Sequence, residues 1–376
     1  MKIAVIGHKR VPSREGGIEK SVEKQMLRLR ERGHEVILYD RSGHNIFGAE
    51  FDAPAGSFRG MKIVTVPTPG NALGVPVYSF LATVRALREK CDILYYHGSG
   101  SCLMIPLARL FGARCVGMIH GIDSQQVKWN RLGRLYLRMG EKAAARRADA
   151  CLVLSESIRD YIREKYGTEP VLTCNGTEPP CLPPDPEAVI RERFGLERDG
   201  YILCVVRIVA GKGLEYLIRA FRACGTEKKL VIAGGVDPVC RDYYAQLREL
   251  AAGDERILFT GFLEEPAVQA LYLQAYAFVF PSDHEGMAHS LLEAMAAGCC
   301  CLVSDIPENT AVIREHGLRF RRGDADDLRE KLQGLLDDPG RVRSLREGTA
   351  AFALRTYDWD AVANQLEEIF GRALSP

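Results

Sequence analysis

The chain has 376 residues, 47% of them hydrophobic, and its 50 Lys and Arg against 49 Asp and Glu leave a net charge of +1. A single core usually stops growing below this length, so two domains are predicted. The even charge balance argues against a nucleic-acid-binding protein with a wholly basic surface. The twelve cysteines form no CxxC pair, which predicts reduced core residues in a cytoplasmic chain and no metal site. No apolar run approaches about 18 residues, so no membrane span is predicted.

The first half of the chain alternates strand and helix patterns. A buried strand at residues 3–6 precedes the polar loop SREGGIEK, and a helix with apolar positions from Ile18 to Leu29 follows and ends at Gly33. A strand starting at Val36 comes next, and further strands are predicted at residues 62–66, 93–96, 115–119 and 150–154. Helices are predicted at residues 77–88 and 131–147. This alternation predicts a parallel sheet with helices on both faces.

A proline-rich stretch, TEPPCLPPDP, follows Gly176 and can continue neither a helix nor a strand. It predicts a linker between a first domain at residues 1–175 and a second at residues 176–358. The strand pattern then restarts at residues 201–206, 230–233, 257–259, 277–280 and 299–303, and a last amphipathic helix lies in residues 359–376. Two such doubly wound domains are expected to carry their ligand crevices at the carboxyl ends of their strands, facing one another across a cleft.

Two cations follow the first strand of the second half. Arg207 comes directly after this strand, and Lys212 lies in AGKG before a helix. Cations beside a helix N-terminus predict a diphosphate site, and a second helix predicted at residues 290–297 adds another N-terminus. The alternative is a pair of ordinary surface cations. Glu285 and Glu293, seven residues apart in SDHEGMAHSLLEAMAAG, stand on either side of that second N-terminus and suit a ligand with hydroxyls at both ends.

Three loops of the first half carry candidate ligand contacts. Gly16 and Gly17 in EGGIE allow a close backbone approach to an anion, or form a plain tight turn. The loop is not G-x-G-x-x-G, although Asp40 stands near the place of the acid in a nicotinamide-binding fingerprint. His120 in HGID and His97 in YYHGSG each follow a strand, so each binds a sugar hydroxyl or phosphate, or is a satisfied loop residue.

The helix near residue 140 is strongly basic. Seven cations stand against the single acid Glu141: Lys128, Arg131, Arg134, Arg138, Lys142, Arg146 and Arg147. The helical spacing of Leu132, Leu135, Tyr136 and Met139 predicts a buried apolar face opposite the cations. The basic face is either simply solvated or a platform for anionic lipid or a lipid-pyrophosphate acceptor.

The chain resembles the retaining glycosyltransferases of family 4. The resemblance rests on these segments, in family order: EGGIE, HGID with the following KW, NG at Asn175, the Arg207 and Lys212 pair, PSDHEGMAHSLLEAMAAG and SDIPENTAVI. HGID and SDIPEN are most similar to bacterial members that build surface polysaccharides, some of them described as rhamnosyltransferases.

The resemblance implies an α/β GT-B fold. In this fold an acceptor-side and a nucleotide-sugar-binding Rossmann-like domain face a central cleft, and the C-terminal helix crosses back to the first domain. The implied reaction is hexosyl transfer with retention from a UDP-, GDP- or dTDP-linked sugar to a saccharide or polyprenyl-linked acceptor, with no cofactor, metal or nucleic acid. The implied location is cytoplasmic, with peripheral contact to the inner face of an anionic membrane.

The resemblance also implies residue roles. Arg207 and Lys212 are expected to bind the donor diphosphate, Glu293 the ribose and Glu285 the donor sugar. His120 is expected to contact the sugar and the leaving phosphate without acting as the base, because the leaving phosphate takes the acceptor proton in a front-face attack. Further donor contacts are expected from Gly16, Gly17, Gly286, Met287, Ala288, His289 and Ser290, and acceptor contacts from His97, Lys128 and Arg131.

The chain departs from the family at two places. Val206 stands where Gly is common, and residues 287–290 replace Phe-Gly and Leu-Pro, which leaves the sugar open. Three other functions also stay open: a nucleotide-sugar epimerase or hydrolase on the same scaffold, a nicotinamide-dependent oxidoreductase, and a catalytically silent carbohydrate-binding protein.

Overall fold

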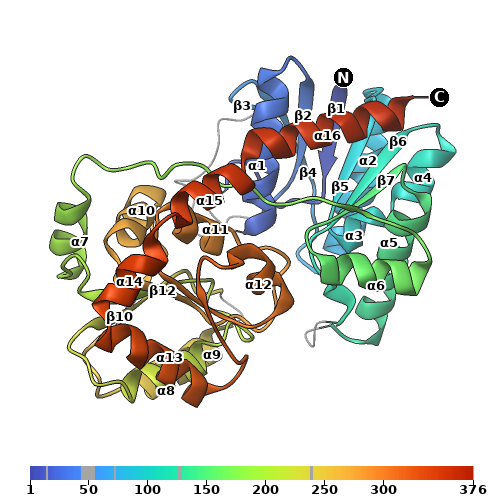
Figure 1. Cartoon of the computed structure of the whole chain (residues 1–376). Coiled ribbons are helices and arrows are strands. Elements are labelled where there is room, and N and C mark those ends of the chain that lie inside the picture. Colours follow the sequence, from blue (N-terminus) through green and yellow to red (C-terminus); the bar gives the residue numbers. More distant parts are fainter. Residues whose placement is uncertain (14–15, 44–55, 72, 126–128, 238–239, 376) are drawn as a thin grey trace. The chain divides into compact units, whose positions relative to one another are not determined.

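The computed structural model describes residues 1–13, 16–43, 56–71, 73–125, 129–237 and 240–375. The chain divides into two compact units: the first is Met1–Gly176 with Trp359–Pro376, and the second is Thr177–Asp358. Both are α/β units built on a sheet, and Figure 1 labels their elements.

The first unit contains an eight-stranded sheet in the order β3-β4-β2-β1-β5-β6-β7-β8. Its strands are β1 (Lys2–Ile6), β2 (Glu35–Arg41), β3 (Ser57–Phe58), β4 (Met61–Val66), β5 (Ile93–His97), β6 (Arg114–Ile119), β7 (Ala150–Val153) and β8 (Val171–Leu172). All neighbours pair in parallel except β3, which forms an antiparallel hairpin with β4. The order of the strands reverses between β1 and β5.

Helices connect the strands of the first unit, and local signals mark the start of α5 and the end of α6. They are α1 (Gly17–Glu31), α2 (Gly74–Arg88), α3 (Ser99–Cys102), α4 (Ile105–Leu110), α5 (Arg131–Arg147), α6 (Glu156–Tyr166) and α16 (Trp359–Leu374). Asn130 caps α5 by accepting a hydrogen bond from the Gly133 amide, and Gly167 ends α6 in a left-handed conformation. Glu367 of α16 binds both Arg32 and His34, which ties the end of the chain to the helix after β1.

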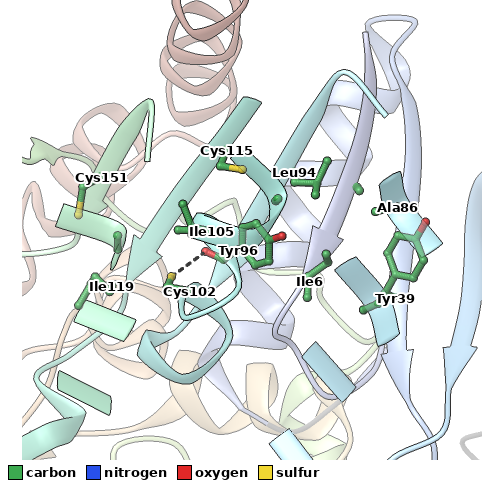
Figure 2. Close-up of a cluster of buried hydrophobic side chains, with 14 of the residues drawn as sticks. Ile6, Tyr39, Ala86, Leu94, Tyr96, Cys102, Ile105, Cys115, Ile119 and Cys151 are labelled. Atoms are coloured by element: carbon green, nitrogen blue, oxygen red, sulfur yellow. Dashed lines mark hydrogen bonds between the residues drawn. The ribbon is translucent and has the colours of Figure 1, made fainter. Parts of the chain in front are cut away.

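A continuous apolar cluster holds one face of this sheet to its helices. Figure 2 shows Ile6, Leu94 and Tyr96 from neighbouring strands, together with Ile105 from α4. Cys102 lies in the same cluster and donates a weak hydrogen bond to the Tyr96 carbonyl, as a reduced core thiol. The apolar runs of the sequence therefore become the inner strands of a parallel sheet, which are covered on both faces.

The second unit contains a six-stranded, fully parallel sheet in the order β11-β10-β9-β12-β13-β14. Its strands are β9 (Tyr201–Val205), β10 (Lys229–Ala233), β11 (Ile257–Gly261), β12 (Ala277–Phe280), β13 (Cys301–Ser304) and β14 (Leu318–Phe320). Its helices are α7 (Pro186–Phe194), α8 (Leu214–Arg222), α9 (Arg241–Ala251), α10 (Glu265–Gln274), α11 (His289–Ala296), α12 (Pro307–Ile313), α13 (Ala325–Asp337), α14 (Pro339–Arg346) and α15 (Thr349–Thr356). The prediction of two Rossmann-like sheets is confirmed.

The buried apolar face predicted for α5 is wrong. Leu132, Leu135 and Met139 are 77%, 55% and 50% exposed. The helix instead packs through Leu137, Gly140, Ala143 and Ala144, and an added Cβ on Gly140 would lie 1.7 Å from the Ser99 carbonyl oxygen of α3. Tyr136 is partly buried and donates to the Gly100 carbonyl, so of the four predicted residues only Leu132, Leu135 and Met139 lie on the outer surface.

Candidate functional site

The order of strands in the second unit predicts a ligand site at the edge of the sheet that the carboxyl ends of its strands form. The chain winds outward from β9 through β10 to β11, and from β12 through β13 to β14, so the order reverses between β9 and β12. Doubly wound sheets bind ligands beyond the carboxyl ends of the two strands at such a point. The loops that leave β9 and β12 carry Lys212 and Glu285, so both predicted residues belong to this edge.

Glycine allows these two loops to touch. Gly213 adopts φ +69°, and an added Cβ would lie 2.1 Å from the Pro281 carbonyl oxygen. The Asp283 amide donates to the Gly211 carbonyl at 2.9 Å, and the Tyr216 hydroxyl contacts both Pro281 and Asp283. Backbone contacts therefore hold the two loops together as one surface.

An ion pair crosses the same contact. Lys212 Nζ lies 2.5 Å from Glu285 Oε1, and the two side chains are only 17% and 12% exposed. Arg207, directly beyond β9, is exposed by contrast. An ammonium this sheltered interacts more strongly with an anion than a solvated surface lysine does.

Two helices begin at this edge without a side-chain cap. Gly213 precedes α8 and Ala288 precedes α11, and neither N-terminus has a side-chain cap hydrogen bond. The first amides of such helices carry a partial positive charge and can bind phosphate oxygens. The predicted contact segment from Gly286 to Ser290 leads into α11 and includes its first two residues, so it contributes backbone amides. Met287 is largely buried there, while Ala288, His289 and Ser290 are partly exposed.

Glu293 lies one turn inside α11. The buried Tyr272 hydroxyl donates to Glu293 Oε2 at 3.4 Å. Burial, and then the Glu293 charge, raise the pKa of Tyr272 well above its usual value, so this phenol keeps its proton and remains a donor. Glu285 and Glu293 thus lie before and after the N-terminus of α11.

A support beneath the β12 loop was not assigned from the sequence. Ser304 ends β13, and its hydroxyl donates to the Ser282 carbonyl at 2.5 Å. The Asn309 amide of α12 donates to the Ser304 hydroxyl at 3.0 Å. All three residues are buried. Ser304 and Asn309 are the first and last residues of SDIPEN, so the motif carried the signal, but its partner loop, about 22 residues away, is defined only by the strand order.

In the first unit the structure brings His97 and His120 together. His97 Nδ1 lies 2.9 Å from His120 Nε2, and the two rings are nearly parallel, edge to edge, with centroids 5.2 Å apart. His97 was expected at an acceptor surface, but it is 1% exposed because its ring packs between Tyr95 and His120. Burial lowers the pKa of His120 to about 4, so its imidazole is neutral near pH 7.

The glycine loop before α1 has a local reason for its composition. Gly16 adopts φ +85°, and an added Cβ would lie 2.1 Å from Glu19 Oε2. Glu19 is buried and accepts a hydrogen bond from the Lys9 amide at 2.8 Å. Gly17 is the first residue of α1. Gly16 therefore allows the chain to enter α1 beside the Glu19 carboxylate.

Asp40, the candidate ribose acid of a nicotinamide site, is already used by the fold. It is buried, binds His8 Nε2 at 2.8 Å and accepts from the Val11 amide at 3.3 Å. A carboxylate held this way presents no oxygen to a dinucleotide, which argues against the oxidoreductase alternative.

The remaining predicted contacts are the acceptor residues Arg131 and Lys128. Arg131 is exposed at the first position of α5, whereas Lys128 lies outside the described residues.

Across the described part of the chain, no group of three or more His, Cys, Asp or Glu residues could hold a metal ion. None of the helices in that same part is long and apolar enough to span a membrane.

Two glycosyltransferase family models match the chain. The Glycosyltransferase Family 4 model matches residues 15–179, and the Glycosyl transferases group 1 model matches residues 187–353. The chain is 27% identical to a GDP-mannose-dependent alpha-(1-6)-phosphatidylinositol monomannoside mannosyltransferase of Mycolicibacterium smegmatis, over 95% of each chain. The serotype-specific mannosyltransferase WbdA of Escherichia coli is 29% identical over 63% of this chain, but the match spans only 30% of WbdA.

A solved structure shares the whole fold. Sucrose-phosphate synthase from Thermosynechococcus elongatus superimposes with a TM-score of 0.82 at 21% identity, covering 99% of this chain and 98% of that one. The two family models lie on the two sheets in chain order, and the strand reversal at β9 and β12 falls within the second. The chain therefore belongs to the family 4 glycosyltransferases of GT-B fold.

Proposed function

We propose that this protein transfers a hexosyl group, with retention of anomeric configuration, from a nucleoside-diphosphate sugar to a saccharide or lipid-linked acceptor. The observation that carries the proposal is the sheltered Lys212–Glu285 pair at the strand reversal of the second unit, beside the uncapped starts of α8 and α11. A cation and helix amides suit a diphosphate, and carboxylates on either side suit the hydroxyl groups of a sugar and a ribose.

Each residue has a chemical task in this proposal. Lys212 and Arg207 neutralise the diphosphate, which becomes more anionic as its bond to the sugar breaks. Glu293 accepts hydrogen bonds from ribose hydroxyls, and Glu285 from the donor sugar. From the first unit, His120 binds the sugar or the leaving phosphate. Gly16 and Gly17 have no side chains, so their loop can come close to the donor diphosphate.

The proposed transfer proceeds by front-face attack. The bond between the anomeric carbon and the phosphate oxygen breaks, and the acceptor oxygen forms its bond to that carbon on the same face. The proton of the acceptor hydroxyl passes to the departing phosphate oxygen, so no side chain has to act as the base. Catalysis then rests on orientation and on electrostatic stabilisation of the leaving group.

A GDP-linked hexose is the first donor to test, because mannosyltransferases recur among the relatives. Purified protein is incubated with GDP-mannose, UDP-glucose or a dTDP-hexose, with and without a polyprenyl-phosphate-linked acceptor, and products are identified by mass spectrometry. Transfer predicts sugar on the acceptor and nucleoside diphosphate released in equal amount. Acceptor-independent hydrolysis, an epimerised donor, or no turnover of any donor would instead favour the alternatives.

We also propose that α5 rests on an anionic membrane surface, where lipid-linked acceptors reside. Leu132, Leu135 and Met139 are exposed along one side of the helix. Arg131, Arg138 and Lys142 are exposed beside them, and none forms an ion pair among the described residues. The one acid of the helix, Glu141, is buried against Tyr161 and Tyr166. Exposed apolar side chains flanked by cations match the boundary between headgroups and acyl chains.

Vesicle flotation tests this surface. The protein is expected to float with vesicles of phosphatidylglycerol and phosphatidylcholine, weakly with pure phosphatidylcholine, and less as salt is raised. Leu135→Glu should abolish flotation. Leu182→Glu, at an exposed leucine of the second unit, should not change it. Equal flotation of the two variants would refute a role for α5, and a concentration-dependent dimer lost in Leu135→Glu would identify a second copy as the occupant.

A further inference from the structure

A histidine pair in the first unit has a defined hydrogen-bond geometry. His97 ends β5 and His120 follows β6, its neighbour in the sheet, so the carboxyl ends of the two strands set the rings side by side. The two rings share a single hydrogen bond, 2.9 Å from His97 Nδ1 to His120 Nε2. His120 is half-buried, whereas His97 is enclosed.

We propose that His97 is a positioning residue that holds His120 in its Nδ1–H tautomer, so that His120 presents a hydrogen-bond donor to its ligand. The identity of that ligand, a donor sugar or its leaving phosphate, rests on the proposed function. The tautomer itself does not.

The position of the shared proton decides the tautomer. When His97 carries its proton on Nδ1, it donates to His120 Nε2, and His120 then holds its own proton on Nδ1. In the opposite arrangement His120 Nε2 donates, and His97 must carry its proton on Nε2. These two arrangements are the neutral options for the pair.

The surroundings of His97 favour the first arrangement. His97 Nε2 is buried and has no hydrogen-bond partner in the part of the chain that the structure describes. A proton on that atom would be an unsatisfied N–H group inside the protein, which costs more than leaving a bare ring nitrogen there. The proton therefore belongs on His97 Nδ1, facing His120.

Both rings stay neutral near pH 7, which keeps the pair in a single arrangement. Burial lowers the pKa of His97 well below its usual value, and the neighbouring His120 and His8 lower it further. The ring of Tyr95 packs against His97 at 4.2 Å between centroids. Among the described residues, no carboxylate is hydrogen-bonded to the ring of His97 or His120. Asp40 binds His8, which is the third histidine near this pair.

The chemical consequence is that His120 donates a hydrogen bond to its ligand and does not accept one from it. Its remaining nitrogen, Nδ1, carries hydrogen and can bind a hydroxyl or phosphate oxygen. It cannot take the proton of an acceptor hydroxyl, which agrees with a front-face transfer in which the leaving phosphate takes that proton.

Nitrogen-15 NMR of ring-labelled histidine in the full chain tests the proposal without any substrate. His120 signals are assigned by their loss in His120→Gln. In the native protein, His120 Nδ1 is expected to have the shift of a protonated ring nitrogen and Nε2 that of a bare one. A protonated His120 Nε2 would overturn the proposal, whether or not the protein transfers sugar.

Two variants separate positioning from packing. His97→Phe keeps a ring but removes the donor, so the His120 signals should move to a mixture of tautomers. His97→Gln keeps an N–H group within reach and should retain the native tautomer. In the transfer assay, kcat should fall about tenfold in His97→Phe with little change in the donor KM, and should recover partly in His97→Gln. Unchanged His120 signals in His97→Phe would show that His97 does not set the tautomer.

Discussion

Gly213 offers a direct test of the contact between the loops after β9 and β12. Alanine at this position has to adopt φ +69°, which costs roughly 1 kcal/mol for a residue with a side chain. Its Cβ would also lie 2.1 Å from the Pro281 carbonyl oxygen, well inside an ordinary C···O contact of about 3.3 Å. Because this oxygen belongs to the backbone, the loops have to part by about 1 Å, with a further cost of about 1–3 kcal/mol.

Gly211 in the same loop is the matched control. It adopts φ +85°, but an added Cβ would meet no heavy atom within 4 Å, so Gly211→Ala carries only the backbone cost. Thermal unfolding should therefore show a shift for Gly213→Ala of several degrees beyond that of Gly211→Ala, at about 2–4 °C per kcal/mol. Calorimetric titration should also show donor affinity at least tenfold weaker in Gly213→Ala, since Lys212 moves away from Glu285. Equal melting and equal affinity in the two variants would refute the account of this contact.

Further predictions concern the support of the site and its acid response. Asn309→Ala removes the donor to Ser304 and should raise the donor KM severalfold while α12 stays folded by circular dichroism; a native KM would mean that this support is dispensable. Folded His120 has a pKa of about 4 against an ordinary value of about 6.5, so only the unfolded chain takes up the proton between these pH values. The contribution of neutral His120 to the free energy of unfolding is fully present above pH 6.5. It is lost as the pH falls toward 4, by up to about 3 kcal/mol. His120→Gln should melt with a weaker dependence on pH over that window, and an identical dependence in both proteins would contradict a neutral His120 imidazole in the folded state. Met139→Glu should weaken flotation with anionic vesicles as Leu135→Glu does, and full binding by it would limit the surface to the first turns of α5.

Much of the fold follows from local patterns in the sequence. The inner strands of both sheets have four to seven residues and are built on apolar runs of four or five that are buried, so their places could be predicted closely. The short edge strands β3 and β8 have two residues each and carry no such pattern. The helices α3 and α4 were missed for a related reason, because a few residues show no amphipathic period.

The residues of the candidate site could be predicted from the sequence, but the contacts between them could not. Lys212 and Glu285 each follow a strand, which a sequence shows, but their ion pair depends on β9 lying next to β12 across 73 positions of chain. The same holds for His97 and His120, whose strands β5 and β6 are neighbours.

For the outer face of α5, the sequence predicted the apolar stripe correctly but predicted its environment wrongly. Helical spacing indicated an apolar stripe correctly, but spacing alone cannot tell a face that packs from one that is exposed. The deciding feature was Gly140, which brings the backbone of α5 against α3, so that the side of the helix with Leu137 and Ala144 is buried and Leu132 and Leu135 lie outside.

The proposed function requires that a nucleoside diphosphate bind beyond the carboxyl ends of β9 and β12, and calorimetric titration of GDP, UDP and dTDP in EDTA measures this binding. Native protein and Lys212→Ala are compared with Lys229→Ala, because Lys229 begins β10 at the opposite, amino end of the same sheet. We predict that one of the three nucleotides binds the native protein and Lys229→Ala alike, and binds Lys212→Ala at least tenfold more weakly. Binding that is unchanged in Lys212→Ala, or no binding of any of the three to well-folded protein, would contradict the account.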